Sequence, residues 1–391
     1  MFSQIRFSKL LQAIPRHAFN KSVQDSGGDR YAKRFSSWDL LVTMIFGQVN
    51  QIQSLRTLST AFGSLSAHHY HLNARSMGRS TLSDALSKRN PEPLRLLCEH
   101  LLQGVARKQR QSIQEKICLI DSTSITLRGP GFDEWAKATK TRITQGLKVH
   151  MAIDPRQSAP TYANVTYANV NDMTDAQGMS LEADMTYVFD KGYCDYSWWH
   201  RIDQSGAFFV TRLKRNANVS HVKEHSSPTE KVVNIERDEV VQFNNRQLNG
   251  RKNPYKDQAV RRIQIKRDDH DTPMILVTND FSRSAAEIAA LYKDRWQIEL
   301  FFKWLKQKLN LKRYLGFSEN AVRIQIYSAL ITYLLMTVYL QRSNYKGSIS
   351  ELAIMLAHCL FERPDTHHFL QRRRQRQEEE LNGIQQSIIF Q

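Results

Sequence analysis

Four side chains suited to phosphodiester chemistry recur at helical spacing in the segment LYKDRWQIELFFKWLKQKLNLKR. They are Tyr292, Arg295, Glu299 and Lys306, in the pattern Tyr-x2-Arg-x3-Glu-x6-Lys. At about 100° per residue, one helix places all four within a stripe of about 60°. A carboxylate among cations suits a metal-dependent phosphodiester site, because the acid holds the metal and the cations hold phosphates.

The same segment carries an apolar face beside that stripe, which predicts a helix packed on a core. Its residues are Leu291, Ile298, Phe301, Phe302 and Leu305. Upstream, Ser284-x2-Glu287 forms a capping box, in which each side chain accepts from the other residue's backbone N–H. The predicted helix therefore starts about two turns before Tyr292.

Two further acids follow short apolar runs that are typical of buried strands. Asp121 comes after 117–120, and Asp190 comes after 185–189. A residue at the end of a strand can project into a surface cleft, so Asp121, Asp190 and Glu299 could supply three carboxylates from three elements. Mg²⁺ and Mn²⁺ prefer such oxygen ligands. From chemistry alone, however, both aspartates could equally well begin turns.

The rest of the chain divides into regions of different composition and predicted secondary structure. Residues 1–110 favour helices and carry many basic side chains, which suits either a solvated bundle or a DNA-binding region. Further strands are expected at 147–153, 161–170, 207–211 and 273–278, and the apolar run 324–340 predicts a buried core helix rather than a membrane span. Residues 215–270 are polar and β-leaning, as in an insertion. The block QRRRQRQEEE at 371–380 is typical of a solvated helix, with a role in DNA binding left open.

Composition narrows the class of protein. The 391 residues carry a formal net charge of +17, which indicates a polyanionic partner such as DNA, RNA or an anionic membrane. The four cysteines form no Cys-x2-Cys pair, which predicts a reduced protein without a zinc finger. Charge and apolar residues mix from the start of the chain, so no signal peptide is expected.

The Tyr-Arg-Glu-Lys spacing resembles the signature of bacterial insertion-sequence transposases with a DDE active site. The segments ICLIDSTSITL, QGLKVHMAID, TYVFDKGYCDYSWW and ILVTND appear in that family's order. The resemblance implies an α/β fold: an RNase H-like mixed sheet flanked by helices, with a β-rich insertion and an N-terminal helical domain. The implied domains are helical DNA-binding 1–110, catalytic core 111–214, insertion 215–272, second half of the core 273–345 and helical tail 346–391.

The resemblance also implies an activity and its residues. The protein would cleave DNA at the element's ends and transfer the 3′-hydroxyl into target DNA, with two Mg²⁺ ions, or Mn²⁺ as a substitute. Asp121, Asp190 and Glu299 would be both catalytic and metal-binding. DNA would be contacted by Tyr292, Arg295, Lys306, Lys303, Lys191 and Lys148. Tyr292 could instead pack its ring and donate to a core carbonyl.

Family membership further implies a cytoplasmic, nucleoid-associated protein that acts as a homodimer on paired ends, without a membrane partner. A hairpin intermediate is implied as well, which in some relatives needs an aromatic residue to hold a flipped base. The insertion lacks tryptophan, which leaves Phe243 and Tyr255 as candidates. A nuclease on the same fold and a non-catalytic DNA-binding derivative stay open. The recognised end sequence and the target preference cannot be predicted.

Overall fold

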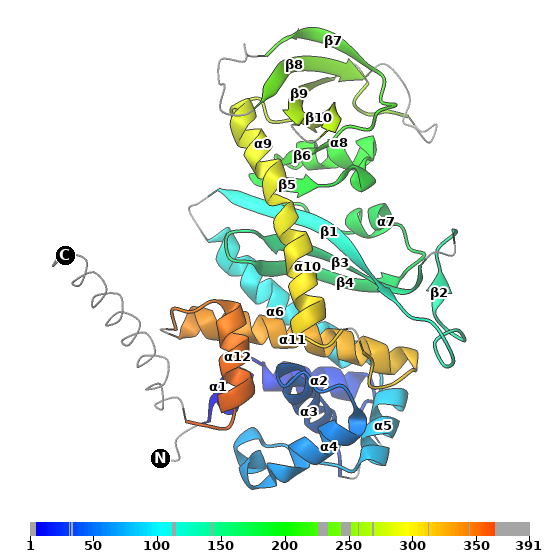
Figure 1. Ribbon diagram of the computed structural model, residues 1–391, viewed down its shortest axis with the longest axis vertical. Helices are drawn as coiled ribbons and strands as arrows, with labels where there is room; N and C mark the ends of the chain where they lie inside the picture. Colours follow the sequence, from blue (N-terminus) through cyan, green and yellow to red (C-terminus); the bar gives the residue numbers. More distant parts are fainter. Residues whose placement is uncertain are drawn as a thin grey trace, which may run out of the picture.

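The computed structural model describes most of the chain at the level of side chains. The described residues are 5–30, 32, 34–111, 115–141, 144–225, 234–243, 252–256, 258–267, 270–311, 313–343 and 345–363. The charged block at 371–380 lies outside this part of the chain. Figure 1 shows an elongated molecule with a helical lower part, a central sheet and a smaller group of strands at the upper end.

A mixed sheet forms the centre of the molecule, in the order β4-β3-β1-β5-β6. Strands β1, β3 and β4 are antiparallel neighbours, whereas β5 and β6 run parallel to β1. This arrangement is the RNase H-like sheet, and the predicted fold class is confirmed. The strands are β1 Lys116–Thr126, β3 Gln145–Asp154, β4 Ala159–Tyr167, β5 Met185–Phe189 and β6 Phe208–Arg212, with the short β2 Lys137–Ala138 beside β3.

Four antiparallel strands extend the sheet beyond β6, in the order β10-β9-β8-β7. They are β7 Val219–Glu224, β8 Ile235–Phe243, β9 Ala259–Arg267 and β10 His270–Thr278. The sequence predicted that 273–278 rejoins the core, and β10 does pair with β6. Because β10 also pairs with β9, it joins the added strands to the central sheet.

The N-terminal helices pack together with the last helices of the described chain in one hydrophobic core. Helix α11 lies at the centre of this part and contacts α3 and α6 (Figure 1). The elements are α1 Arg6–Leu11, α2 Arg16–Asp25, α3 Ser37–Val49, α4 Leu55–Ser64, η1 Ser66–Leu72, α5 Arg79–Lys88, α6 Glu92–Arg110, α11 Glu319–Arg342 and α12 Ile349–Cys359.

Two of these helices, α3 and α11, are strongly apolar and lie in the core. Helix α3 begins with a capping box between Ser36 and Asp39 and is buried on all sides. Helix α11 is long and apolar enough to cross a membrane by composition, yet 89% of its most apolar window is buried inside the protein. It is therefore a core helix, as predicted.

Shorter helices lie against the sheet near Asp121 and Asp190. They are α7 Asp172–Ala176, η2 Lys191–Tyr193, α8 Tyr196–Gln204, α9 Ala285–Asp294 and α10 Trp296–Lys308. The predicted capping box starts α9, with Ser284 and Glu287 bonded reciprocally. The sequence predicted one helix through 306. The structure instead has two helices in line (Figure 1), separated by a tight turn at Arg295, because the Ile298 N–H bonds to the Arg295 carbonyl at 3.2 Å.

Candidate active site

Asp121 and Asp190 lie beside each other where two parallel strands part. The last paired residues of β1 and β5 are Ile120 and Phe189, so each aspartate is the next residue along. The prediction that β1 ends at Asp121 was wrong, because its other neighbour, β3, continues the pairing as far as Thr126. Asp121 is thus held on a strand that is paired on one side and open on the other.

Glu299 reaches the same place from α10. The Arg295 guanidinium lies 2.7 Å from Glu299 Oε1 and 3.8 Å from Asp121 Oδ2, so one cation bridges two of the three acids. Helical spacing explains the first contact, because residues four apart lie on one face. The Glu299 side chain is 35% exposed, which leaves an edge open to solvent.

The pKa of Asp121 responds to both of the other acids. The pKa of Asp121 is raised to about 6, chiefly by burial and to a smaller extent by the negative charges of Glu299 and Asp190. The Ser122 backbone N–H, at 2.8 Å, and Arg295 oppose this shift. Arg295 therefore offsets only part of the upward shift in the pKa of Asp121.

Tyr292 and Lys306 extend the site along the signature stripe. The Tyr292 side chain is 7% exposed, and its hydroxyl donates to Asp190 Oδ1 at 3.4 Å rather than to a core carbonyl. Burial raises its pKa to about 12. Lys306 Nζ donates to Thr123 Oγ1 at 2.6 Å and to the Ser124 carbonyl at 3.2 Å. All four signature residues therefore face the same region of β1 and β5.

The donor set fits a hard divalent cation, since it consists of carboxylate oxygens with solvent access. Within the described residues, no three acid, histidine or cysteine side chains are gathered tightly enough to hold an ion as they stand. Arg295 lies between Asp121 and Glu299, and its guanidinium would have to give way to a cation that these two acids share.

The remaining predicted DNA contacts differ in accessibility. Lys303 and Lys191 are exposed. The Lys148 side chain is only 13% exposed, and its ammonium donates to Asp172 at 3.0 Å and to the Val170 carbonyl at 2.9 Å. This position favours a structural role for Lys148 over contact with DNA.

Asp172 is a further acid near the site that the sequence analysis did not single out. Its carboxylate accepts from Ser122 Oγ at 2.8 Å and from Lys148, and it lies 3.5 Å from His150 Nδ1. Burial lowers the pKa of His150, although Asp175 and Asp172 partly offset this effect. Because the Ser122 N–H donates to Asp121, Asp172 supports the backbone that orients the first acid. The sequence signal that could have found Asp172 is the alternation of Lys148 and His150 on β3, because both side chains face this acid.

The aromatic residues proposed for a flipped base are not accessible. Phe243 and Tyr255 are each 1% exposed, and the Tyr255 hydroxyl donates to the Trp199 carbonyl at 3.3 Å. That expectation was wrong, because both rings pack in the core between the insertion strands and α8. Trp296, next to Arg295, is 57% exposed instead.

The sheet defines a protein of the RNase H-like fold class, and sequence comparison gives its family. Residues 113–335 match the family described as "Transposase DDE domain". A transposase-named protein of Sinorhizobium fredii, y4zB, is 38% identical over 293 residues, which cover 74% of this chain and 79% of that protein. The chain therefore belongs to the insertion-sequence transposases with a DDE domain, a family of DNA-binding proteins that generally depend on divalent metals.

Other comparisons give more distant relatives. A Geobacillus stearothermophilus protein named for the insertion sequence element IS5377 is 27% identical over 273 residues, covering 69% of this chain and 70% of its own. Residues 3–75 match a domain of unknown function, DUF4372. A piggyBac transposase synaptic complex with hairpin DNA covers 93% of this chain and 83% of its own at 10% identity, with a TM-score of 0.49.

Proposed function

We propose that this transposase moves its element by cut-and-paste transposition, with Asp121, Asp190 and Glu299 as the catalytic and metal-binding residues. The observation that supports this proposal is that Arg295 links Asp121 on β1 to Glu299 on α10, while Asp190 follows β5 directly beside Asp121. Two Mg²⁺ ions, with Mn²⁺ as a substitute, would activate the attacking oxygen and stabilise the leaving one.

The residues of this chain would orient each step around that centre. At the element's end, water attacks the scissile phosphorus, the bond to the 3′ oxygen breaks, and a free 3′-hydroxyl remains. That hydroxyl then attacks a phosphorus of the target DNA and displaces the target's own 3′ oxygen. Arg295 would hold a phosphate once the acids bind cations, because a guanidinium can bind two phosphate oxygens. Tyr292, bonded to Asp190, would orient that acid.

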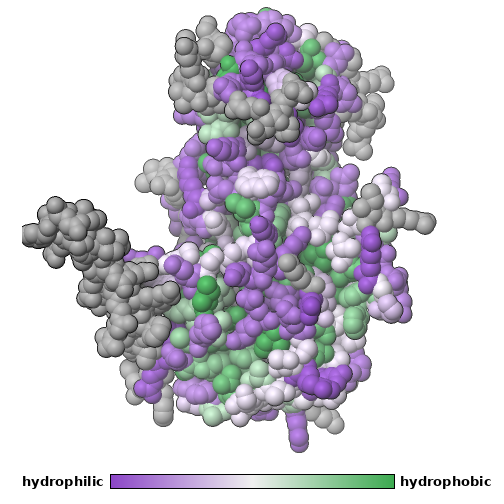
Figure 2. Space-filling model, viewed as in Figure 1, coloured by the Kyte–Doolittle hydropathy of each residue, from purple (hydrophilic) through white to green (hydrophobic). Residues whose placement is uncertain are grey.

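The DNA would follow the positive face of α10. Figure 2 shows hydrophilic residues along the middle of the face that α9 and α10 occupy in Figure 1. Lys303 on α10 and Lys191 on η2 are exposed and would make sequence-independent phosphate contacts. Trp296 offers a ring on which a base could stack, and it would serve a hairpin intermediate better than the buried aromatics of the insertion.

The assembly and the location of the reaction follow from its substrates. Cleavage and joining of two ends require two active sites, so a homodimer on paired ends is proposed. The N-terminal helices would supply part of the grip on terminal DNA. The reaction would take place on the bacterial nucleoid in the cytoplasm.

A gel assay with purified protein tests this function. The substrates are a duplex carrying the terminal repeat of the element, a supercoiled target plasmid and Mg²⁺. Joined product is expected, and Glu299→Gln should bind the duplex but neither cleave nor join it. Cleavage without joining would indicate a nuclease, and a mobility shift alone would indicate a binding protein; either outcome contradicts the proposal.

A further inference from the structure

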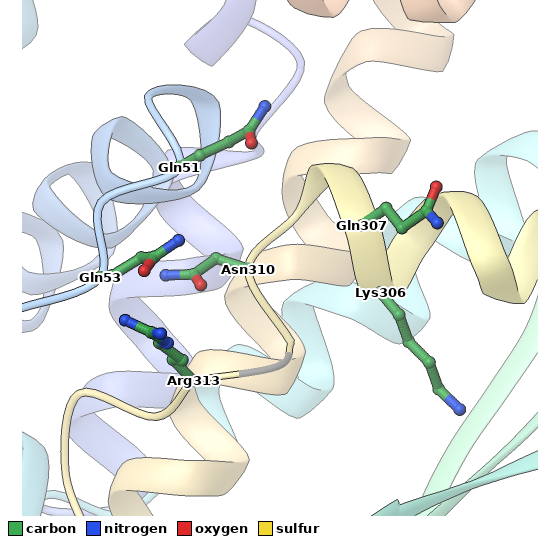
Figure 3. Close-up of a pocket in the computed structure, with 6 residues that line it drawn as sticks. All are labelled: Gln51, Gln53, Lys306, Gln307, Asn310 and Arg313. Carbon is green, nitrogen blue, oxygen red and sulfur yellow. The ribbon is translucent and has the colours of Figure 1, made fainter.

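A polar pocket of about 260 Å³ opens where the N-terminal helices meet the end of α10. The loop between α3 and α4 supplies one wall, and the segment that leaves α10 supplies the other (Figure 3). Four of its six lining residues are primary amides and two are cations, with no acid: Gln51, Gln53, Gln307, Asn310, Lys306 and Arg313. This chemistry differs from that of the neighbouring carboxylate cluster.

Hydrogen bonds hold both walls of the pocket in place. Asn310 Nδ2 donates to the Ile52 carbonyl and so ties the two walls together. The buried amide of Gln325 on α11 then fixes the second wall, because its Nε2 donates to the carbonyls of Asn310 and Arg313 at 2.8 Å each. Its Oε1 also accepts from the Leu315 N–H at 2.9 Å.

Backbone strain marks both walls of the pocket. Gln51 has φ 52° and Asn310 has φ 39°, the left-handed region that residues other than glycine rarely adopt. Such conformations persist where surrounding structure enforces them, and they concentrate at functional sites. Here the Ile52 N–H, bonded to the Gly47 carbonyl at 2.9 Å, helps to hold the strained loop.

The polar groups that face the pocket are available to a ligand. Gln51, Gln53 and Arg313 are exposed, and in the described part of the chain their side chains make no hydrogen bond. Gln53, Asn310 and Arg313 point toward one another in Figure 3. Lys306 turns its ammonium away from them, toward β1, where it bonds to Thr123.

We propose that this pocket binds a nucleobase of the transposon-end DNA and reads its edge, a role that rests on the proposed function. A primary amide presents a donor and an acceptor side by side, which matches the N6 and N7 edge of adenine. Arg313 supplies a cation for the flanking phosphate. The helical segment of unknown function would thereby take part in sequence recognition together with the catalytic domain.

The distance from the acids sets the position of that base. Glu299 and Lys306 are seven residues apart on α10. Seven residues span about 10 Å of helix, or about three nucleotide steps along one B-form strand. The base read by the pocket should therefore lie about three nucleotides from the phosphate at the carboxylate cluster.

An abasic-site scan tests the inference with the full-length protein. The probes are duplexes of the terminal repeat, each lacking one base, and binding is measured by fluorescence anisotropy. Wild-type protein should lose about tenfold in affinity at one position near the third nucleotide. Gln53→Ala should bind the intact duplex about tenfold more weakly and should no longer respond to loss of that base. The exposed Gln103 on α6 provides a matched control, and Gln103→Ala should behave as wild type.

Three outcomes would overturn the proposal. The scan could be flat, Gln53→Ala could keep the wild-type response, or Gln53→Ala could weaken binding equally to terminal and unrelated duplexes, as a phosphate contact would. Thermal unfolding of each variant separates misfolding from lost contact, and Gln51→Ala provides a second variant on the same wall. Wild-type cleavage of the same duplexes is measured in parallel. Cleavage with a flat scan rejects the pocket alone, whereas absent cleavage rejects the proposed function.

Discussion

Two groups of acids lie on or beside the same extended sheet, and they differ in how many arginines pair with them. In the insertion, Asp238 and Glu239 each have an arginine of their own: Arg261 lies 2.8 Å from Asp238, and Arg262 lies 2.7 Å from Glu239. At the candidate active site, Asp121 and Glu299 share a single cation, Arg295, and the carboxylate of the nearby Asp190 accepts only from the Tyr292 hydroxyl among the described residues. In the first group each acid is paired with its own arginine, whereas in the second the acids outnumber the arginine that contacts them.

The pKa values follow this difference. Burial alone would raise the pKa of Glu239, but hydrogen bonds from Arg262 and His221 lower it. Burial raises the pKa of Asp121 to about 6, and Ser122 and Arg295 do not reverse the shift. A carboxylate cluster that is destabilised in this way gains most from a divalent cation, and such a shift is typical of functional sites.

Removing one acid from the active-site group should have the largest effect on activity. Glu299→Gln keeps the shape of the side chain but removes a charged metal ligand, so cleavage of a terminal duplex should fall by about 1000-fold or more. Duplex binding should change by less than about threefold, because phosphate contacts supply most of the affinity. Single-turnover gels and anisotropy measure the two effects, and cleavage at the wild-type rate would remove Glu299 from the site.

Removing one acid from the insertion group should act on folding instead. Asp238→Ala leaves the Arg261 guanidinium, 1% exposed, without its carboxylate. The free energy of unfolding should fall by about 3–5 kcal/mol, as measured in urea. Protein that remains folded should cleave DNA at the wild-type rate. A variant of unchanged stability would show that this pair is not the structural element described.

The active-site charge should lower the stability of the metal-free protein. Unfolded Asp121 has a pKa of 3.8 and folded Asp121 one of about 6. Below pH 3.8 both states are protonated. As pH rises to 6 the unfolded state loses its proton first, so stability falls and then stays low. With EDTA at pH 8, Asp121→Asn should therefore stabilise the protein by about 1–3 kcal/mol. The gain should vanish near pH 4, and an equal gain at both pH values would refute the electrostatic explanation.

Single surface cations should have the smallest effects. Lys303→Ala removes an exposed charge from α10, so affinity for DNA should fall by only a few fold. The fall should be equal for terminal and unrelated duplexes, and the slope of log affinity against log salt should decrease by about one. A loss confined to the terminal duplex would assign Lys303 to base recognition instead.

Much of the fold was predictable because local patterns determined it. The apolar runs before Asp121 and Asp190, the capping box at Ser284 and the buried run of α11 each carry their own signal in sequence. The length of β1 beyond Asp121 was not predictable, because it depends on pairing with β3. The break between α9 and α10 was not predictable either, because no glycine or proline marks it in the sequence.

The residues of the candidate site could be predicted from the sequence, but the contacts between them could not. The family resemblance identified the acids and the cations, yet spacing alone could not show that Arg295 would link Asp121 to Glu299. Asp172 carries no signal of its own in the sequence, and it contacts Ser122 from the start of α7. The amide pocket was invisible in sequence, since its walls are more than 250 residues apart.

Binding of Mn²⁺ to the full-length protein tests the central claim most directly. The claim is that Asp121, Asp190 and Glu299 together hold divalent ions. Titration calorimetry at pH 8 with terminal duplex present should show Mn²⁺ binding to wild-type protein and at least tenfold weaker binding to Asp190→Asn and to Glu299→Gln. Glu134→Gln, an exposed acid elsewhere on the surface, should bind as wild type does. Equal Mn²⁺ affinity in wild-type protein and both active-site variants would contradict the account.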